Sequence, residues 1–132
     1  MVMKGEKMDV RSSRDSQYSE HVDLLLSKLD LKNKTIVEIG SNSNLVSASL
    51  LNKECEVVYA TNIIKGFSET PSTEGIIPLE LDARLLNTHF EKNSIDLIYG
   101  IAVSEHIHDP SLMLDAIFDI LKPGGYFFVH GG

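Results

Sequence analysis

Apolar and polar positions follow two rhythms along this chain, one typical of helices and one typical of buried strands. Apolar side chains recur at helical spacing after residue 16, which predicts an amphipathic helix with Ser16 as its N-cap and residues 1–15 as a flexible arm. Short apolar runs bounded by turn residues predict strands, and their alternation with helical segments favours an α/β fold with a parallel sheet. The predicted strands are Thr35–Ile39, Val57–Thr61, Ile76–Leu81, Ile95–Tyr99 and Tyr126–His130.

The segments between these runs carry residues that start and stop helices. Gly40–Asn44 turns the first strand into a helix. Asp109 is the expected N-cap of the last helix, with Pro110 in its first turn, and Leu121–Gly125 predicts its end. Asp96 is interpreted as a structural residue at the start of the fourth strand. Residues 16–132 are therefore expected to form one domain.

Composition narrows the class of protein. The formal net charge of −7 and the lack of a basic cluster argue against nucleic acid or an anionic membrane as partner. The single cysteine excludes an internal disulfide, and no cysteine and histidine spacing of the zinc type is present, so no metal is expected. The start of the chain lacks the apolar core of a signal peptide, which favours a cytoplasmic location.

The turn after the first strand is the expected ligand contact. In open parallel sheets a ligand binds beyond the carboxyl ends of the strands, near the point where the strand order reverses. Gly40 permits a positive φ and a close approach of a ligand, and Asn42 and Asn44 are expected to tolerate the left-handed region as well. The G-x-G-x-x-G fingerprint of dinucleotide sites is absent, so a ligand without phosphates fits better.

Several of these segments together resemble the class I S-adenosylmethionine-dependent methyltransferases, and especially their small-molecule, type 11-like branch. The resemblance covers roughly residues 35–129, and the ordered set from Asp82 to Gly125 is its most specific part. It implies a Rossmann-like three-layer sandwich with strand order 3-2-1-4-5, lacking the last two strands that usually follow. The segments that carry it are Glu38–Asn44, Asp82–Ala83, Gly100–His106 and Leu121–Gly125.

The resemblance also implies a cofactor, S-adenosylmethionine, and the residues that would bind it. Glu38, Gly40, Ser41 and Asn42 match the segment that approaches the methionine part. The remaining matches are Asn62 for the ribose, Asp82 and Ala83 for the adenine, and Gly100 for the wall of the site. Asn62 stands where the family usually has an acidic residue, and an amide offers no charged bidentate contact.

His106 is the candidate catalytic residue, because an imidazole titrates near neutral pH and this segment would face the methyl acceptor. Simpler roles stay open: His106 could orient its loop, Glu38 could cap its own turn, and Asp82 could be an ordinary turn former. Cys55 lies between two glutamates, lacks the electropositive surroundings that activate a thiolate, and is assigned no role.

These observations leave two functions open. The first is methyl transfer to a small-molecule acceptor, and the second is a non-catalytic methyltransferase-like module or an inactive fragment. An NAD-dependent oxidoreductase is disfavoured because the glycine fingerprint and an acidic residue after the second strand are both missing. An apolar fifth strand at the edge of a sheet invites pairing, so the chain is expected to be either a piece of a longer enzyme or a homodimer through that edge.

Overall fold

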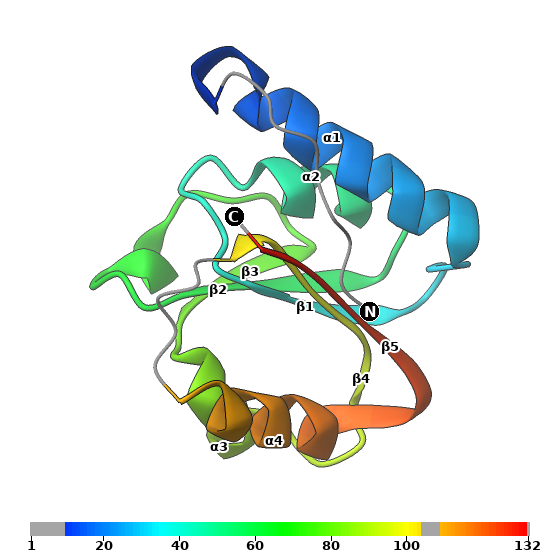
Figure 1. The fold of residues 1–132 in the computed structure, drawn as a ribbon, viewed down its shortest axis with the longest axis vertical. Helices are drawn as coiled ribbons and strands as arrows, with labels where there is room; N and C mark the ends of the chain where they lie inside the picture. The colour runs from blue at the N-terminus through cyan, green and yellow to red at the C-terminus, as the bar shows by residue number, and fades with distance from the viewer. Residues whose placement is uncertain (1–9, 104–108, 132) are drawn as a thin grey trace.

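A five-stranded parallel sheet lies between two layers of helices in the computed structural model, which describes residues 10–103 and 109–131. Two helices, α1 (Val10–Lys28) and α2 (Val46–Asn52), cover one face of the sheet. The other face is covered by α3 (Leu86–His89) and α4 (Pro110–Ile120), as Figure 1 shows. The predicted three-layer α/β sandwich is therefore confirmed.

The strand order is β3-β2-β1-β4-β5, and every neighbouring pair is parallel. This order is the one that the sequence predicted. The chain leaves β3 and returns on the far side of β1, so the order reverses between β1 and β4, which lie side by side. The strands are β1 (Thr35–Ile39), β2 (Val57–Asn62), β3 (Ile76–Glu80), β4 (Ile95–Val103) and β5 (Leu121–Gly131), and two short 3-10 helices are η1 (Phe67–Glu69) and η2 (Ala83–Leu85).

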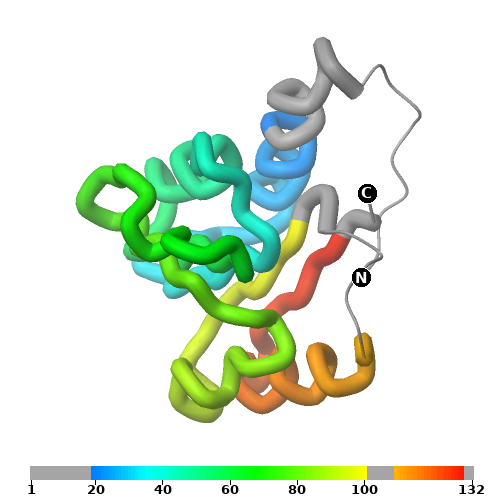
Figure 2. The backbone as a smooth tube through the Cα atoms, turned by 90° about the vertical axis from the view of Figure 1, so that its left-hand side faces the viewer, coloured from blue at the N-terminus to red at the C-terminus, as the bar shows by residue number. Residues whose placement is uncertain are grey.

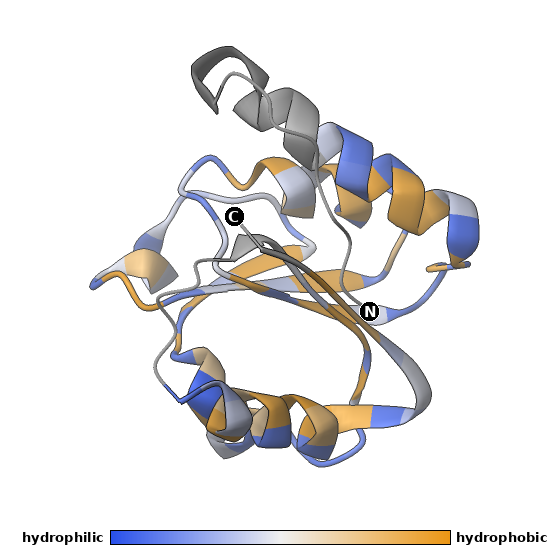
Figure 3. Ribbon diagram, viewed as in Figure 1, coloured by the Kyte–Doolittle hydropathy of each residue, from blue (hydrophilic) through white to orange (hydrophobic). Residues whose placement is uncertain are grey.

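The central strand β1 divides the core into two halves. Alternate side chains of a strand point to opposite faces, so Ile36 packs in the cluster under α1 and α2 while Val37 packs in the cluster over α3 and α4. Both side chains are fully buried, as expected of a parallel strand covered on both faces. Figure 3 shows the same division, with hydrophobic residues along the strands and on the inner faces of the helices.

Most strand ends lie within one residue of the prediction, but three elements differ by more. Strand β4 continues to Val103 instead of ending at Tyr99. Helix α1 begins at Val10, so Ser16 lies within the helix and is not its N-cap. Residues 10–15 contain neither glycine nor proline, so nothing in them stops the helix from extending. Strand β5 begins at Leu121, which pairs with Ile95, and the strand shifts register before Tyr126 pairs with Leu97. The glycines of this segment therefore sit in a strand irregularity.

The start of α4 agrees with its prediction. The Asp109 side chain accepts a hydrogen bond from the Leu112 amide, and Pro110 lies in the first turn. Asp96 is structural, as expected: its carboxylate accepts hydrogen bonds from the Thr35 amide at 2.9 Å and from Lys122 Nζ at 3.1 Å. These contacts tie the beginnings of three neighbouring strands together.

Strand β5 forms one edge of the described sheet, beside β4, as Figure 2 shows in red and yellow. Its Tyr126 side chain is exposed, as is Phe118 of the neighbouring helix α4. Pairing of this edge with a second copy stays a prediction, and light scattering combined with size-exclusion chromatography would test it. Among the described helices, none is both long and apolar enough to cross a membrane.

Candidate functional site

The turn between β1 and α2 lies at the carboxyl edge of the sheet, next to the point where the strand order reverses. Gly40 is exposed and has a φ of 71°, a conformation that glycine adopts without steric cost. The Ser41 amide donates to the Thr61 carbonyl oxygen at 2.9 Å, which fixes the turn to β2. The expectation that Asn42 and Asn44 take the left-handed region is wrong, because Leu45 takes it instead, with a φ of 53°. Leu45 is buried, and its packing in the core offsets the cost of that conformation.

Glu38 points into the protein beneath this turn. The residue is 1% exposed, and its carboxylate accepts hydrogen bonds from the hydroxyls of Ser41, in the turn, and Ser47, on α2. Burial raises the pKa of Glu38, and the hydrogen bonds from the two serines partly oppose that effect. Glu38 therefore joins the turn to the helix that follows it, and no local pattern of residues predicted Ser47 as its partner.

The Tyr99 hydroxyl of β4 completes this buried cluster. It is fully buried and makes no hydrogen bond of normal geometry among the described residues. It still lies close enough to Glu38 to favour the charged carboxylate. Burial, followed by the negative charge of Glu38, raises the pKa of the Tyr99 hydroxyl well above its ordinary range, so the phenol keeps its proton. The hydroxyl is thus an available donor directed at the polar cluster.

Asn62 links the first turn to the end of β2. Its Nδ2 donates to the Ser41 carbonyl oxygen at 2.6 Å, and its Oδ1 accepts from the Ile64 amide at 3.0 Å. A primary amide has two donor hydrogens and two acceptor lone pairs, so Asn62 keeps one donor and one acceptor for another partner. Ile63 and Ile64, which follow, are 70% and 59% exposed and form an apolar rim beside it.

Asp82 lies just beyond β3 and caps η2. The carboxylate accepts hydrogen bonds from the backbone amide and the guanidinium of Arg84, including a 2.7 Å contact between Oδ2 and Nη2. The hydrogen bonds from Arg84 lower the pKa of Asp82, and the same contact raises the pKa of Arg84. Ala83 is buried beside it.

The structure gathers most of the predicted site residues along the ends of adjacent strands. Hydrogen bonds connect Glu38 to Ser41 and Ser41 to Asn62. The Leu81 amide donates to the Asn62 carbonyl oxygen at 2.9 Å, which brings the segment before Asp82 to the end of β2. The other predicted residues belong to neighbouring segments. Gly40 and Asn42 belong to the first turn, Ala83 follows Asp82, and Gly100 is a buried residue of β4. His106 lies outside the described residues.

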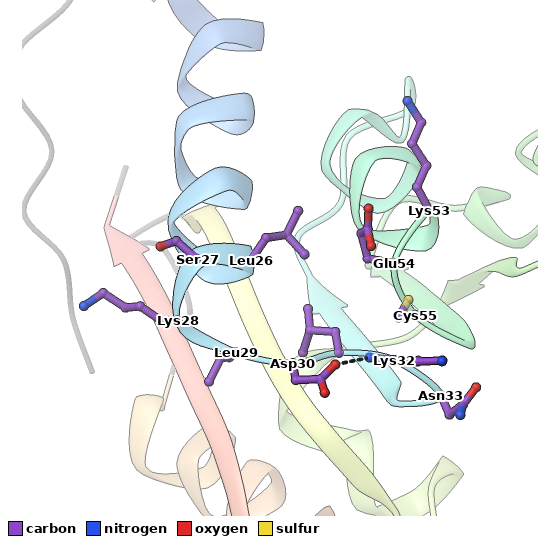
Figure 4. Close-up of a pocket in the computed structure, with 11 residues that line it drawn as sticks. Leu26, Ser27, Lys28, Leu29, Asp30, Lys32, Asn33, Lys53, Glu54 and Cys55 are labelled. Carbon is purple, nitrogen blue, oxygen red and sulfur yellow. Dashed lines mark hydrogen bonds between the residues drawn. The ribbon is translucent and has the colours of Figure 1, made fainter.

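A separate hollow of about 910 Å³ lies at the opposite edge of the sheet, before β1 and β2 (Figure 4). It is lined by the end of α1, by the loop that follows it and by residues 53–55, and its lysines Lys28, Lys32 and Lys53 point in different directions. They do not converge on a common ligand. Burial raises the pKa of the Cys55 thiol, which agrees with an unreactive cysteine. Within residues 10–103 and 109–131, no group of three or more metal-ligating side chains is found.

The chain is similar to known proteins both in sequence and in fold. Residues 37–129 match the family model described as a methyltransferase domain. A ubiquinone biosynthesis O-methyltransferase from Paraburkholderia phymatum is 27% identical over 107 residues, which cover 77% of this chain and 46% of that protein. The chain thus spans about half the length of this relative.

Two solved structures illustrate the likeness in fold. A SAM-dependent methyltransferase from Aquifex aeolicus superposes with a TM-score of 0.75 at 15% identity, covering 93% of this chain and 72% of the other. Phosphoethanolamine N-methyltransferase 1 from Haemonchus contortus, in complex with phosphoethanolamine and S-adenosylhomocysteine, superposes with a TM-score of 0.69 at 21% identity. That likeness covers 89% of this chain and 26% of the Haemonchus chain.

Proposed function

Because the chain belongs to the methyltransferase domain family, we propose that it binds S-adenosylmethionine and serves methyl transfer to a small-molecule acceptor. The observation that carries the proposal is the row of polar groups along the carboxyl edge, from the first turn through Asn62 to Asp82. This is where open parallel sheets bind their ligands. Because the chain spans only part of its curated relative, the acceptor and the complete active site belong to this proposal.

The residues present suit a cofactor of this kind. The exposed Gly40 lets the methionine end approach the backbone of the first turn, which Ser41 and Asn42 continue. The spare donor and acceptor of Asn62 match a pair of ribose hydroxyls. Asp82 supplies an acceptor for the adenine amino group.

The remaining predicted residues have indirect or flanking roles in the proposed site. Glu38 holds the first turn from below, through its bonds to the two serine hydroxyls. Ala83 would lie beside the adenine position, and Gly100, which pairs with Val129 of β5, would line the site without a side chain to obstruct it.

When bound, S-adenosylmethionine supplies an electrophilic methyl group, which an acceptor lone pair takes by in-line displacement at carbon. The protein's part in such a reaction is chiefly alignment of the two reactants and exclusion of water, and a strong base is not required for a good nucleophile. The first turn, Asn62 and Asp82 would fix the cofactor against the sheet. His106 is the proposed acid or base on the acceptor side.

Calorimetric titration of the full chain tests this proposal. S-adenosylmethionine and S-adenosylhomocysteine should both bind with a one-to-one stoichiometry, and NADH should not bind. The chemistry of the turn predicts this selectivity, because the glycine fingerprint that receives a pyrophosphate is missing. A folded sample that binds neither sulfur ligand would contradict the proposal.

Substitution of Asp82 tests the adenine position. Asp82→Ala should weaken binding of S-adenosylhomocysteine by about 1–3 kcal/mol, the cost of losing a buried hydrogen bond in the complex. Asp115→Ala is the matched control, because Asp115 is an exposed aspartate of α4 and carries the same charge. Equal affinities for the two variants would remove Asp82 from the site.

A non-catalytic binding module is the second candidate function, and one observation favours it. The polar groups of Glu38, Asn62 and Asp82 all have partners within the protein already. A module that binds the cofactor without turnover would show saturable binding of S-adenosylmethionine but no S-adenosylhomocysteine formation with a broad panel of phenol, amine and thiol acceptors. Formation of methylated product with any of them would exclude it.

A further inference from the structure

The Asp82 carboxylate is occupied on both oxygens by a single residue. Oδ1 accepts from the Arg84 backbone amide at 2.9 Å and from Nε at 3.1 Å. Oδ2 accepts from Nε at 3.2 Å and from Nη2 at 2.7 Å. A carboxylate has about four acceptor positions, so these contacts use its whole capacity. An adenine amino group can reach Asp82 only if the guanidinium gives up at least one of them.

The ion pair between Arg84 and Asp82 is exposed enough to solvent to break at little cost. The side chains of Arg84 and Asp82 are 36% and 28% exposed, so water can replace each partner. Ion pairs with this degree of exposure contribute little net stability, since solvation recovers most of what the contact supplies. A ligand that offers its own donor to Asp82 therefore competes on nearly equal terms with Arg84.

Asp109 is a second acidic residue with which the Arg84 guanidinium could pair after it leaves Asp82. Helix η2, which carries Arg84, packs against α4, and the charge of Asp109 at the N-cap of α4 also stabilises the Arg84 cation. Asp109 Oδ1 accepts from Ser111 Oγ at 2.9 Å and from the Leu112 amide at 3.3 Å. Within the described residues Oδ2 receives no hydrogen bond. Among the described residues, Arg84 thus contacts one fully engaged carboxylate, Asp82, and is carried by a 3-10 helix that packs on the helix capped by a second carboxylate, Asp109.

We propose that the Arg84 side chain blocks the adenine position in the free protein, where it is paired with Asp82. When a ligand's exocyclic amino group binds Asp82, Arg84 pairs with Asp109 instead. We call this exchangeable Arg84–Asp82 pair the latch. This inference rests on the proposed function. The apparent association constant of the ligand is the intrinsic constant multiplied by the fraction of molecules in which Arg84 is not paired with Asp82. The latch also selects for ligands with an amino donor, because a ligand without one leaves the Asp82 charge uncompensated when Arg84 departs. Arg84 is therefore a specificity-determining residue.

Titration with S-adenosylhomocysteine is the first arm of the test. Arg84→Met keeps the apolar stem and removes the donors, so it should bind the ligand about two- to five-fold more tightly than the wild type, as expected from releasing one half-exposed ion pair. Lys92→Ala serves as the charge-matched control, because Lys92 is exposed and lies in the turn before β4. Its affinity should equal that of the wild type. An unchanged or weaker affinity of Arg84→Met would overturn the latch.

The receiving carboxylate is tested with Asp109→Asn, which keeps an efficient N-cap and removes the charge. This variant should bind S-adenosylhomocysteine about two- to five-fold more weakly, because the open position of Arg84 is less favourable. In the Arg84→Met background the same change should have no effect, since the two residues then no longer interact. An undiminished effect of Asp109→Asn in that background would contradict the transfer of Arg84.

The failure of the latch and the failure of the proposed function give different results. If the wild type and all variants fail to bind S-adenosylhomocysteine while their unfolding curves stay normal, the proposed cofactor site itself is wrong. If the wild type binds and Arg84→Met binds no better, the site stands and the latch is wrong. A thermal unfolding measurement on each variant separates both outcomes from loss of the fold.

Discussion

Glu38 and Asp82 are carboxylates at the same edge of the sheet, yet their surroundings are opposite. Glu38 is buried beneath the first turn and accepts from two serine hydroxyls, whereas Asp82 is partly exposed and is held by one arginine. Burial raises the pKa of Glu38, and the Arg84 cation lowers the pKa of Asp82. Access to water, and not position along the edge, therefore decides which role each carboxylate can take.

The two residues should therefore have different roles, Glu38 in the structure of the site and Asp82 in ligand binding. Glu38 has partners in the turn and in α2 that no ligand could replace without rearranging the helix, so it belongs to the framework of the site. Asp82 exchanges partners with water at little cost and can exchange them with a ligand. Glu38, the framework carboxylate, should therefore contribute mainly to the stability of the fold. Asp82, the exchangeable carboxylate, should contribute mainly to ligand affinity.

Replacing each carboxylate by alanine should give the largest difference between the two residues, in the free energy of unfolding. Glu38→Ala leaves buried hydroxyls without an acceptor and opens a cavity, so it should lower the free energy of unfolding by about 2–4 kcal/mol. Asp82→Ala should lower it by no more than about 1 kcal/mol, because its ion pair is partly exposed. Urea unfolding curves give both values. Similar losses in the two variants would show that the distinction between framework and exchangeable carboxylate is wrong.

Two serines on α2 allow the contribution of one hydrogen bond to Glu38 to be measured. Ser47→Ala removes one donor from the buried carboxylate and should destabilise the protein by about 1–2 kcal/mol. Ser49→Ala is the matched control on the same helix, because Ser49 is exposed, and it should change stability by less than about 0.5 kcal/mol. A Ser47 effect no larger than that of Ser49 would mean that the buried hydrogen bond contributes nothing.

The pH dependence of stability should have opposite signs for the two carboxylates. The folded pKa of Glu38 is raised above 4.5, so its contribution is fully present below that pH and is lost as the pH rises through the folded pKa. The folded pKa of Asp82 is lowered below 3.8, so its contribution is present above that pH and is lost as the pH falls through the folded pKa.

Unfolding of the variants at a series of pH values measures this difference, which is the smallest of the expected effects. The stability of the wild type relative to Glu38→Gln should decline as the pH rises above 4.5. Relative to Asp82→Asn, wild-type stability should instead decline as the pH falls below 3.8. Slopes of the same sign for the two pairs would contradict the assigned environments.

Local signals in the sequence were sufficient for most of the architecture. The five apolar runs predicted all five strands, and Asp109 with Pro110 predicted the start of α4, because caps and short buried strands depend on neighbouring residues. The start of α1 was missed because a polar segment without glycine or proline gives no boundary. The left-handed residue of the first turn was assigned to asparagines, although burial of Leu45 selects that position.

The contacts of the candidate site depend on chain segments that only the fold brings together. Gly40, Asn62 and Asp82 were predicted as residues of one edge, and strand order alone places them there. The pairing of Glu38 with Ser47 joins a strand to a helix, and neither residue type in itself predicts it. The engagement of Asp82 by Arg84 was also missed, because an aspartate after a strand is as typical of a plain turn as of an ion pair.

Amide chemical-shift mapping would locate the cofactor, which we propose binds at the carboxyl edge of the sheet. S-adenosylhomocysteine would be titrated into the isotopically labelled full chain while the backbone amide resonances are followed. If the cofactor binds at the carboxyl edge, the largest shift changes should fall on residues 40–44, 62–64 and 82–85. Changes that centre instead on residues 26–33 and 53–55, around the hollow at the opposite edge, would contradict this proposal.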